Sequence, residues 1–233
     1  MNAPSLSLGY VPGATPAKWA RTWTQRHPDV PLRLCAVTAA KAADAVRAGT
    51  VDVVLLRLPA DTSGLAVIPL YEETTVAVVP TDHVLTAADE ITAADLDGEP
   101  TLRPLDDVVG WTVGAPVEHR PETTKDAIEL VATGLGVLIV PQSLARLHHR
   151  KDLTYRPVAG APTCPVALAL PTGPQSVPVA EFIGIVRGRK PGTSRGPAQP
   201  APKRTAREKT LAKQAARAAA GKTARQPAKR GRR

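Results

Sequence analysis

The chain has 233 residues and a formal net charge of +9, but this charge is unevenly divided. Residues 1–186 hold 14 Lys and Arg against 20 Asp and Glu, a net of −6, whereas residues 187–233 hold 16 against one, a net of +15. We therefore expect an acidic globular body and a basic tail. No apolar run approaches the ~20 residues of a membrane span and the N-terminus lacks a signal-peptide pattern, so we expect a soluble, cytoplasmic protein.

The first part of the chain predicts strands that alternate with helices. Strands rich in Val and Leu are expected at 6–11, 31–37 and 51–58. Thr15 predicts the N-cap of the first helix with Pro16 at its first position, and Thr38 predicts the cap of a second helix that runs to Arg47. A β-α-β-α-β order requires a mostly parallel sheet with helices on both faces.

The remainder of the body continues this alternation. We expect a strand pair at 67–80, a short capped helix at 92–96, loops at 97–122, strands at 153–157 and 165–170, and a last helix at 179–187. Between them, residues 123–141 predict an amphipathic helix followed by a buried strand. Gly134 and Gly136 are expected to supply the left-handed geometry that ends this helix.

The residue types that usually carry catalysis or bind metals do not occur here at the spacings of catalytic or metal-binding motifs. Cys35 and Cys164 are too few for a disulfide framework or a zinc site, and we interpret both as buried thiols. His148–His149 is expected at a helix end, where a cation complements the helix dipole. Asp106–Asp107 lies in a loop without metal-ligand spacing, and the common nucleophile and phosphate-binding motifs are missing. We therefore expect neither catalysis nor a cofactor.

Six short motifs follow one another along residues 27–141. They are HPDV at 27–30, VRAGTVD at 46–52, LYEE at 70–73, DHVL at 82–85, ADL at 94–96, and LVATGLGV at 130–137 with Pro141. In this order, within a body of about 180 residues, they resemble the effector-binding (substrate-binding) domain of LysR-type transcriptional regulators.

The resemblance implies an α/β fold of two lobes, like that of type II periplasmic binding proteins, with a ligand cleft between them. We expect the domain at 5–187, with the first lobe at about 5–82 and 163–187 and the second at about 83–162. A disordered tail is expected at 188–233. The family carries a winged helix-turn-helix before this domain, and we expect this chain to lack it because the first strand begins near Leu6.

Ligands of such folds bind at the ends of strands and at helix N-termini, where unpaired N–H groups favour anions. The resemblance places the ligand contacts at Thr15, Thr38, Thr101, Arg103, Thr123 and Thr124. Hydroxyls and N–H groups suit a small carboxylate, which Arg103 would bind through two hydrogen bonds. The alternative is that each threonine only caps a helix, worth ~1 kcal/mol without any ligand, and that Arg103 is a surface or linker residue.

The basic tail predicts contact with nucleic acid. Binding to phosphate through Lys and Arg is sequence-independent and weakens with salt, and the tail has no aromatic residue on which bases would stack. The candidate residues are Lys203, Arg204, Arg207, Lys209, Lys213, Arg217, Lys222, Arg225, Lys229 and Arg230. The alternative is a solubilising extension without a partner.

Together these patterns predict a non-enzymatic domain that senses a small, anionic metabolite. It would regulate transcription through its tail or by pairing with a full-length regulator, and family domains pair side by side, so a homodimer is also expected. Three alternatives stay open: a degenerate module that binds nothing specific, an enzyme on the same fold, and a nucleoid-associated protein that acts through its tail.

Overall fold

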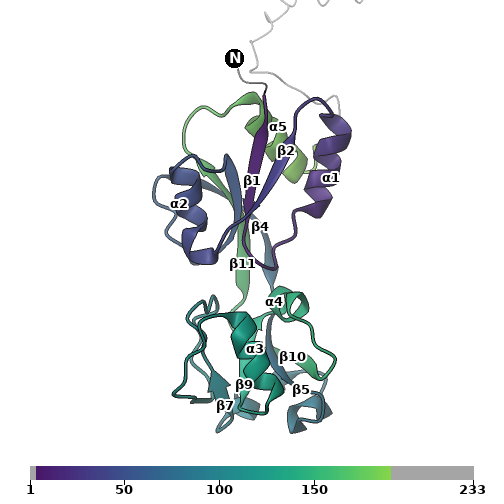
Figure 1. Ribbon diagram of the computed structural model, residues 1–233, viewed down its shortest axis with the longest axis vertical. Coiled ribbons are helices and arrows are strands. Elements are labelled where there is room, and N and C mark those ends of the chain that lie inside the picture. The colour runs from purple at the N-terminus through teal and green to yellow at the C-terminus, as the bar shows by residue number, and fades with distance from the viewer. Residues whose placement is uncertain (1–3, 190–233) are drawn as a thin grey trace, which may run out of the picture. The chain divides into compact units, whose positions relative to one another are not determined.

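Two β-sheets, each covered by helices, form the part of the chain that the computed structural model describes, residues 4–189 (Figure 1). Contacts divide the chain into units at 1–190 and 191–233. The predicted disorder of the tail and its ten candidate basic residues lie outside the described residues. The tail was expected to begin at Gly188, but Gly188 and Arg189 still belong to the helix end, where their N–H groups donate to Ile185 O and Gly184 O. None of the described helices is long and apolar enough to cross a membrane.

The first sheet has five strands in the order β2-β1-β3-β11-β4. Their bounds are Leu6–Tyr10 for β1, Leu32–Ala36 for β2, Val53–Arg57 for β3, Leu65–Glu73 for β4 and Cys164–Pro171 for β11. Strand β1 is parallel to β2 and β3, whereas β11 runs antiparallel to β3 and β4. The predicted β-α-β-α-β opening is confirmed.

Helices cover both faces of the first sheet. They are α1 (Ala17–Arg26), the short 3₁₀ helix η1 (Ala39–Lys41) with α2 (Ala42–Arg47), and α5 (Val177–Val186). Because the chain turns back past β1 to reach β3, right-handed crossovers place α1 and α2 on opposite faces, as Figure 1 shows. The cover explains why every residue of β3 is buried.

Trp23 anchors α1 to the core of the first lobe. Its side chain is 1% exposed, and its indole Nε1–H donates to Val30 O at 2.8 Å, so the polar end of the ring is satisfied. The ring packs against Phe182 of α5 with centroids 5.9 Å apart. Trp23 therefore forms an aromatic contact between α1 and the last described helix.

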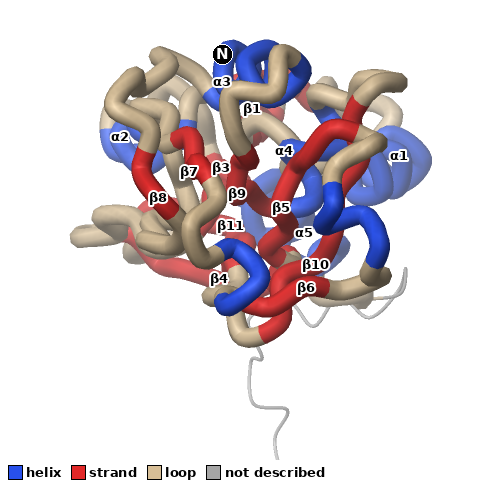
Figure 2. The backbone as a smooth tube through the Cα atoms, turned by 90° about the horizontal axis from the view of Figure 1, so that it is seen from below, coloured by secondary structure: helices blue, strands red, loops and turns tan. Residues whose placement is uncertain are grey.

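The second sheet has six strands in the order β6-β10-β5-β9-β7-β8. Their bounds are Thr75–Pro80 for β5, Ile91–Thr92 for β6, Pro100–Leu102 for β7, Ala115–Pro116 for β8, Val137–Pro141 for β9 and Leu153–Ala159 for β10. Its helices are α3 (Thr124–Ala132), α4 (Gln142–Leu147) and the 3₁₀ helices η2 (Val84–Ala87) and η3 (Ala94–Leu96). Figure 2 shows β6, β10 and β5 side by side at one edge of this sheet.

The chain passes from the first sheet to the second within one extended stretch. Strand β4 ends at Glu73, and β5 begins at Thr75 but pairs with β9 and β10. The crossing therefore falls at Thr74, earlier than the predicted lobe boundary after residue 82. The sequence shows one strand-like run here, and only strand pairing reveals the change of sheet. The return passes through residues 160–163.

The two glycines after α3 have different roles. Gly134 adopts a φ of 78° and ends the helix as predicted. The prediction of left-handed geometry at Gly136 is wrong, because its φ is not positive. A Cβ at Gly136 would instead collide with the carbonyl oxygen of Pro100 on the neighbouring strand β7. Gly136 is thus required by the close approach of two backbones.

Asparagine at each glycine should separate these two roles. Gly134→Asn should lower the free energy of unfolding by less than about 1 kcal/mol, because Asn tolerates left-handed backbone and the site is open. Gly136→Asn should cost about 1–3 kcal/mol, because β7 must move away. Urea denaturation of both variants measures this, and equal losses would contradict the close approach.

Candidate functional site: the cleft between the lobes

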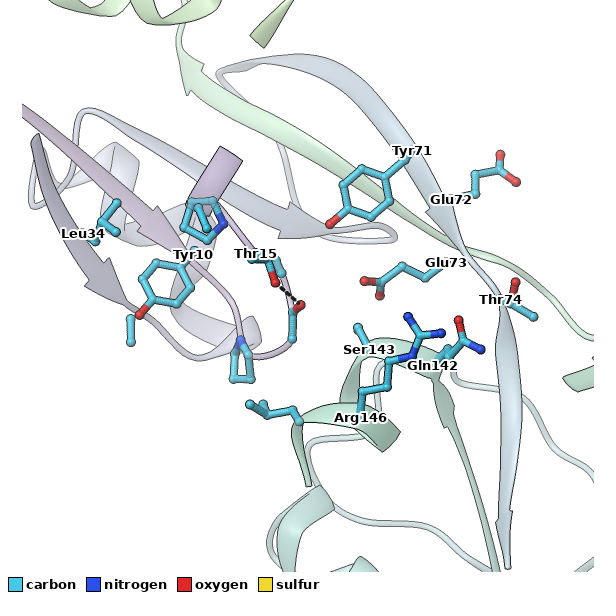
Figure 3. A pocket seen from close by; sticks show the side chains of 17 residues that line it. Tyr10, Thr15, Leu34, Tyr71, Glu72, Glu73, Thr74, Gln142, Ser143 and Arg146 are labelled. Atoms are coloured by element: carbon cyan, nitrogen blue, oxygen red, sulfur yellow. Dashed lines mark hydrogen bonds between the residues drawn. The ribbon is translucent and has the colours of Figure 1, made fainter. Parts of the chain in front are cut away.

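A cleft of about 880 Å³ lies between the two lobes of the described unit (Figure 3). Its walls come from the segment that joins β1 to α1, the edge strand β2, the end of β4 and the helix α4. The lining residues are Tyr10, Pro12–Ala17, Leu34, Ala36, Tyr71–Thr74, Gln142, Ser143, Arg146 and Leu147. The carboxyl end of β1 is where the strand order reverses, the usual ligand position in open α/β sheets.

The start of α1 faces this cleft with unpaired N–H groups. The predicted cap by Thr15 is wrong: Pro16 is the N-cap residue and no side chain caps the helix. The Thr15 hydroxyl donates instead to Gly13 O at 3.4 Å. The first-turn N–H groups therefore lack intrahelical partners and carry the positive end of the helix dipole. This wall of the cleft favours an anion.

Arg146 provides positive charge on the opposite wall. It is an exposed residue of α4, and its Nε donates to the Tyr155 hydroxyl at 3.2 Å. Its two Nη atoms have no hydrogen-bond partner among residues 4–189. In Figure 3 the guanidinium rises from α4 toward the cleft. Arg146 was not among the residues predicted from the sequence.

A buried arginine links three segments that line the cleft. The side chain of Arg57, at the end of β3, is 3% exposed, and its Nε donates to Glu73 Oε2 at 2.7 Å. Its Nη1 donates to Pro12 O at 2.7 Å, and its Nη2 donates to Ser143 Oγ at 2.8 Å. Arg57 thus joins the segment after β1, the end of β4 and the helix α4. The signal missed in the sequence was a charged residue, Arg57, that interrupts the apolar run at 53–58.

Tyr71 lies beside this ion pair. Burial raises the pKa of its phenol, the negative charge of Glu73 adds to the rise, and the positive charge of Arg57 opposes it. The phenol is consequently protonated at neutral pH and available as a hydrogen-bond donor on the cleft wall.

The predicted ligand contacts of the first lobe are separated by the structure. Thr15 lines the cleft. Thr38 is exposed, precedes η1 without a side-chain capping bond, and does not belong to the cleft lining. The two helix starts therefore differ. Residues 12–17 line the cleft at the start of α1, whereas the lining from β2 ends at Ala36 and includes no residue of η1.

The three predicted threonines of the second lobe serve local structure and lie outside the cleft lining. Thr101 is buried in β7. Thr123 caps α3 as predicted, accepting from the Asp126 N–H at 3.1 Å. The Thr124 hydroxyl donates to Asp106 at 2.9 Å and ties the loop after β7 to the helix start.

Arg103 lies in the same part of the second lobe. Its backbone carbonyl accepts from Arg120 Nε at 3.1 Å. Its own Nε and Nη2 are buried and have no hydrogen-bond partner among the described residues. Buried donors without acceptors are costly, so this guanidinium has unused capacity for an anion, although it lies away from the cleft.

Other titratable groups do not add a reactive centre within residues 4–189. His148 is the C-cap residue of α4, at the helix end as predicted. Burial and Lys125 lower its pKa, with Asp106 opposing, which favours the neutral form over the cation. Burial raises the pKa of the Cys164 thiol, whereas Cys35 is only partly buried. No group of three or more His, Cys, Asp and Glu in this range could hold a metal ion.

Comparison with known sequences identifies the family. Residues 3–190 match the family described as LysR substrate binding domain, and the chain belongs to it. The Hca operon transcriptional activator HcaR of Escherichia coli is 29% identical over 79% of this chain and 67% of the relative. A probable hydrogen peroxide-inducible genes activator of Mycobacterium avium is 28% identical over 59% and 49%. The chain thus spans about half to two thirds of the length of these relatives.

Solved structures share the fold. The BenM effector-binding domain, determined with its effector benzoate, has a TM-score of 0.67 and 19% identity over 79% of this chain and 90% of that chain. The oxidised form of OxyR has a TM-score of 0.65 and 20% identity over 79% and 93%. The two-lobe fold predicted from the motifs is confirmed.

Breaking the Arg57–Glu73 pair should destabilise the domain strongly. Arg57→Met should lower the free energy of unfolding by about 3–5 kcal/mol, because it leaves the Glu73 carboxylate buried without its cation. Ser143→Ala removes one hydrogen bond and should cost about 1 kcal/mol. Urea denaturation compares them, with the Arg57→Met/Glu73→Met double variant as control. The double variant should be more stable than Arg57→Met alone; a lower stability would refute this account of the pair.

Proposed function

We propose that the domain binds a small anionic metabolite in the cleft between its lobes and acts as a non-enzymatic ligand sensor in transcription regulation. The observation that carries the proposal is the pair of positive features on facing lobes. The uncapped start of α1 lies on one wall and the Nη atoms of Arg146 lie on the other. A carboxylate is suited to both.

Contact with both lobes gives a means of signalling. A ligand that interacts with α1 and α4 together favours the arrangement in which these elements are closest, by as much as its affinities for the two arrangements differ. Benzoate, the effector of the BenM domain, is itself a small carboxylate and supports an anion here. The domain would act in the cytoplasm as a homodimer or paired with a full-length regulator.

Of the four second-lobe residues predicted from the sequence, one stays in the proposal. Arg103 has two buried, unpaired nitrogens among the described residues, which an anionic group would satisfy. Thr101, Thr123 and Thr124 are already engaged in local hydrogen bonds. Arg103 is therefore the member of this group that we retain as an anion contact, at a position outside the cleft lining.

Loss of Arg146 should weaken binding of small acids. Isothermal titration of benzoate and a panel of aliphatic carboxylates should show about tenfold weaker binding to Arg146→Ala, because a hydrogen-bonded charge pair is lost. Arg21→Ala, on the exposed face of α1, should bind as the unchanged protein does. If no acid in the panel binds the unchanged protein, the degenerate-module alternative is favoured.

We propose that the basic segment after residue 189 associates with nucleic acid without sequence preference. Its high density of Lys and Arg supports this. Nucleic-acid binding by this segment would add to ligand sensing by the folded domain. In the alternative of a nucleoid-associated protein, it would be the main function of the chain.

Removal of this segment should abolish DNA binding. Fluorescence anisotropy of a labelled duplex should show binding by the full chain that falls steeply with salt, and none by residues 1–189. Two duplexes of unrelated sequence serve as the specificity control. Equal binding by the truncated chain would place the contact on the folded domain instead.

A further inference from the structure

Glu73 is a buried carboxylate with one oxygen left unpaired at the cleft. The residue is 8% exposed and lines the cleft. Its Oε2 accepts from Arg57 Nε at 2.7 Å. Its Oε1 takes part in no hydrogen bond with the described residues. Oε1 is open to the cleft, so either water or a donor group of a ligand can reach it.

The position of Glu73 directs this oxygen toward a ligand. Residues two apart on a strand share one face, and Figure 3 shows Tyr71 and Glu73 projecting from β4 into the space bounded by Thr15 and Arg146. Glu72, between them, points the other way. The cleft thus offers anion-binding groups at the α1 start and on Arg146, and an acceptor on the strand that joins the lobes.

We propose that Glu73 is a specificity-determining residue that selects acids which also carry a hydroxyl or amino donor. The inference rests on the proposed function, since it assigns a second contact in the same cleft. An ionised acid group has no hydrogen to donate to Glu73, so it is oriented toward α1 and Arg146, which supply donors. Because Arg57 already offsets the charge of Glu73, a neutral hydroxyl serves as donor as well as an ammonium group does. The ligand class is therefore hydroxy acids and amino acids.

A bound water is the competing partner for the free oxygen. If a water molecule stays hydrogen-bonded to Oε1 whichever acid is bound, the cleft does not distinguish an acid with a donor from an acid without one. Displacing that water with a hydroxyl retains the hydrogen bond, whereas displacing it with a methyl group loses the bond. Selectivity among acids of matched shape separates the two cases.

Matched sets of acids test the proposal on the full chain. The sets are pentanoate with 5-hydroxypentanoate and 5-aminopentanoate, 4-methylpentanoate with its 2-hydroxy and 2-amino forms, and benzoate with its 3-hydroxy and 3-amino forms. Each set keeps one skeleton and places the donor at a different distance from the acid. In at least one set, isothermal titration should show the donor-bearing acids binding about tenfold tighter than the plain acid.

Variants then locate the source of the preference. Glu73→Gln should reduce it several-fold, whereas Glu90→Gln should leave it unchanged because Glu90 is exposed and lies outside the cleft lining. If Glu73→Gln does not fold, as circular dichroism would show, the Arg57→Met/Glu73→Met double variant replaces it and should abolish the preference.

The outcomes separate this inference from the proposed function. Equal binding of plain and donor-bearing acids in all three sets would overturn the role of Glu73 and leave the anion site intact. A preference that survives in the Glu73 variants would also overturn it. Binding of none of the acids would contradict the proposed function, and the role of Glu73 with it.

Discussion

A buried guanidinium at the junction of the lobes constrains the site more than any other group in the described residues. A positive charge removed from water is costly unless it is paired and hydrogen-bonded. Arg57 meets this requirement by reaching a carboxylate on β4, a carbonyl after β1 and a hydroxyl on α4. These three elements form walls of the cleft, so satisfying one cation also sets where those walls lie.

The same arrangement gives the cleft wall both positive and negative parts. The acidic composition of the body predicts a negative surface on average, yet the α1 start and Arg146 make two parts of the cleft wall positive. Glu73 supplies an acceptor on the connecting strand, with its charge offset by Arg57. Local dipoles and single side chains, rather than net charge, therefore decide what such a cleft attracts.

Sequence patterns succeeded where a local rule is sufficient. Thr123 caps α3 because the hydroxyl and its target N–H are three residues apart, and the apolar runs of β3 and β9 are buried as predicted. Thr15 failed as a cap because Pro16 took the N-cap position. Gly136 was misread because its constraint comes from a strand distant in sequence. The order of six motifs was enough to recognise the family, which residues 3–190 confirm.

The sequence by itself determined the alternation of strands and helices and the family, because apolar periodicity, turn residues and short motifs are properties of neighbouring residues. Only the tertiary structure decided which residues share the cleft. Arg57 lies 16 positions from Glu73 and 86 from Ser143, and strand pairing with two crossings between the sheets brings them together. Such contacts depend on how distant elements pack, which no local pattern encodes. For this reason five of the six predicted ligand residues lie outside the cleft lining. For the same reason the sequence analysis missed Arg57, Glu73 and Arg146.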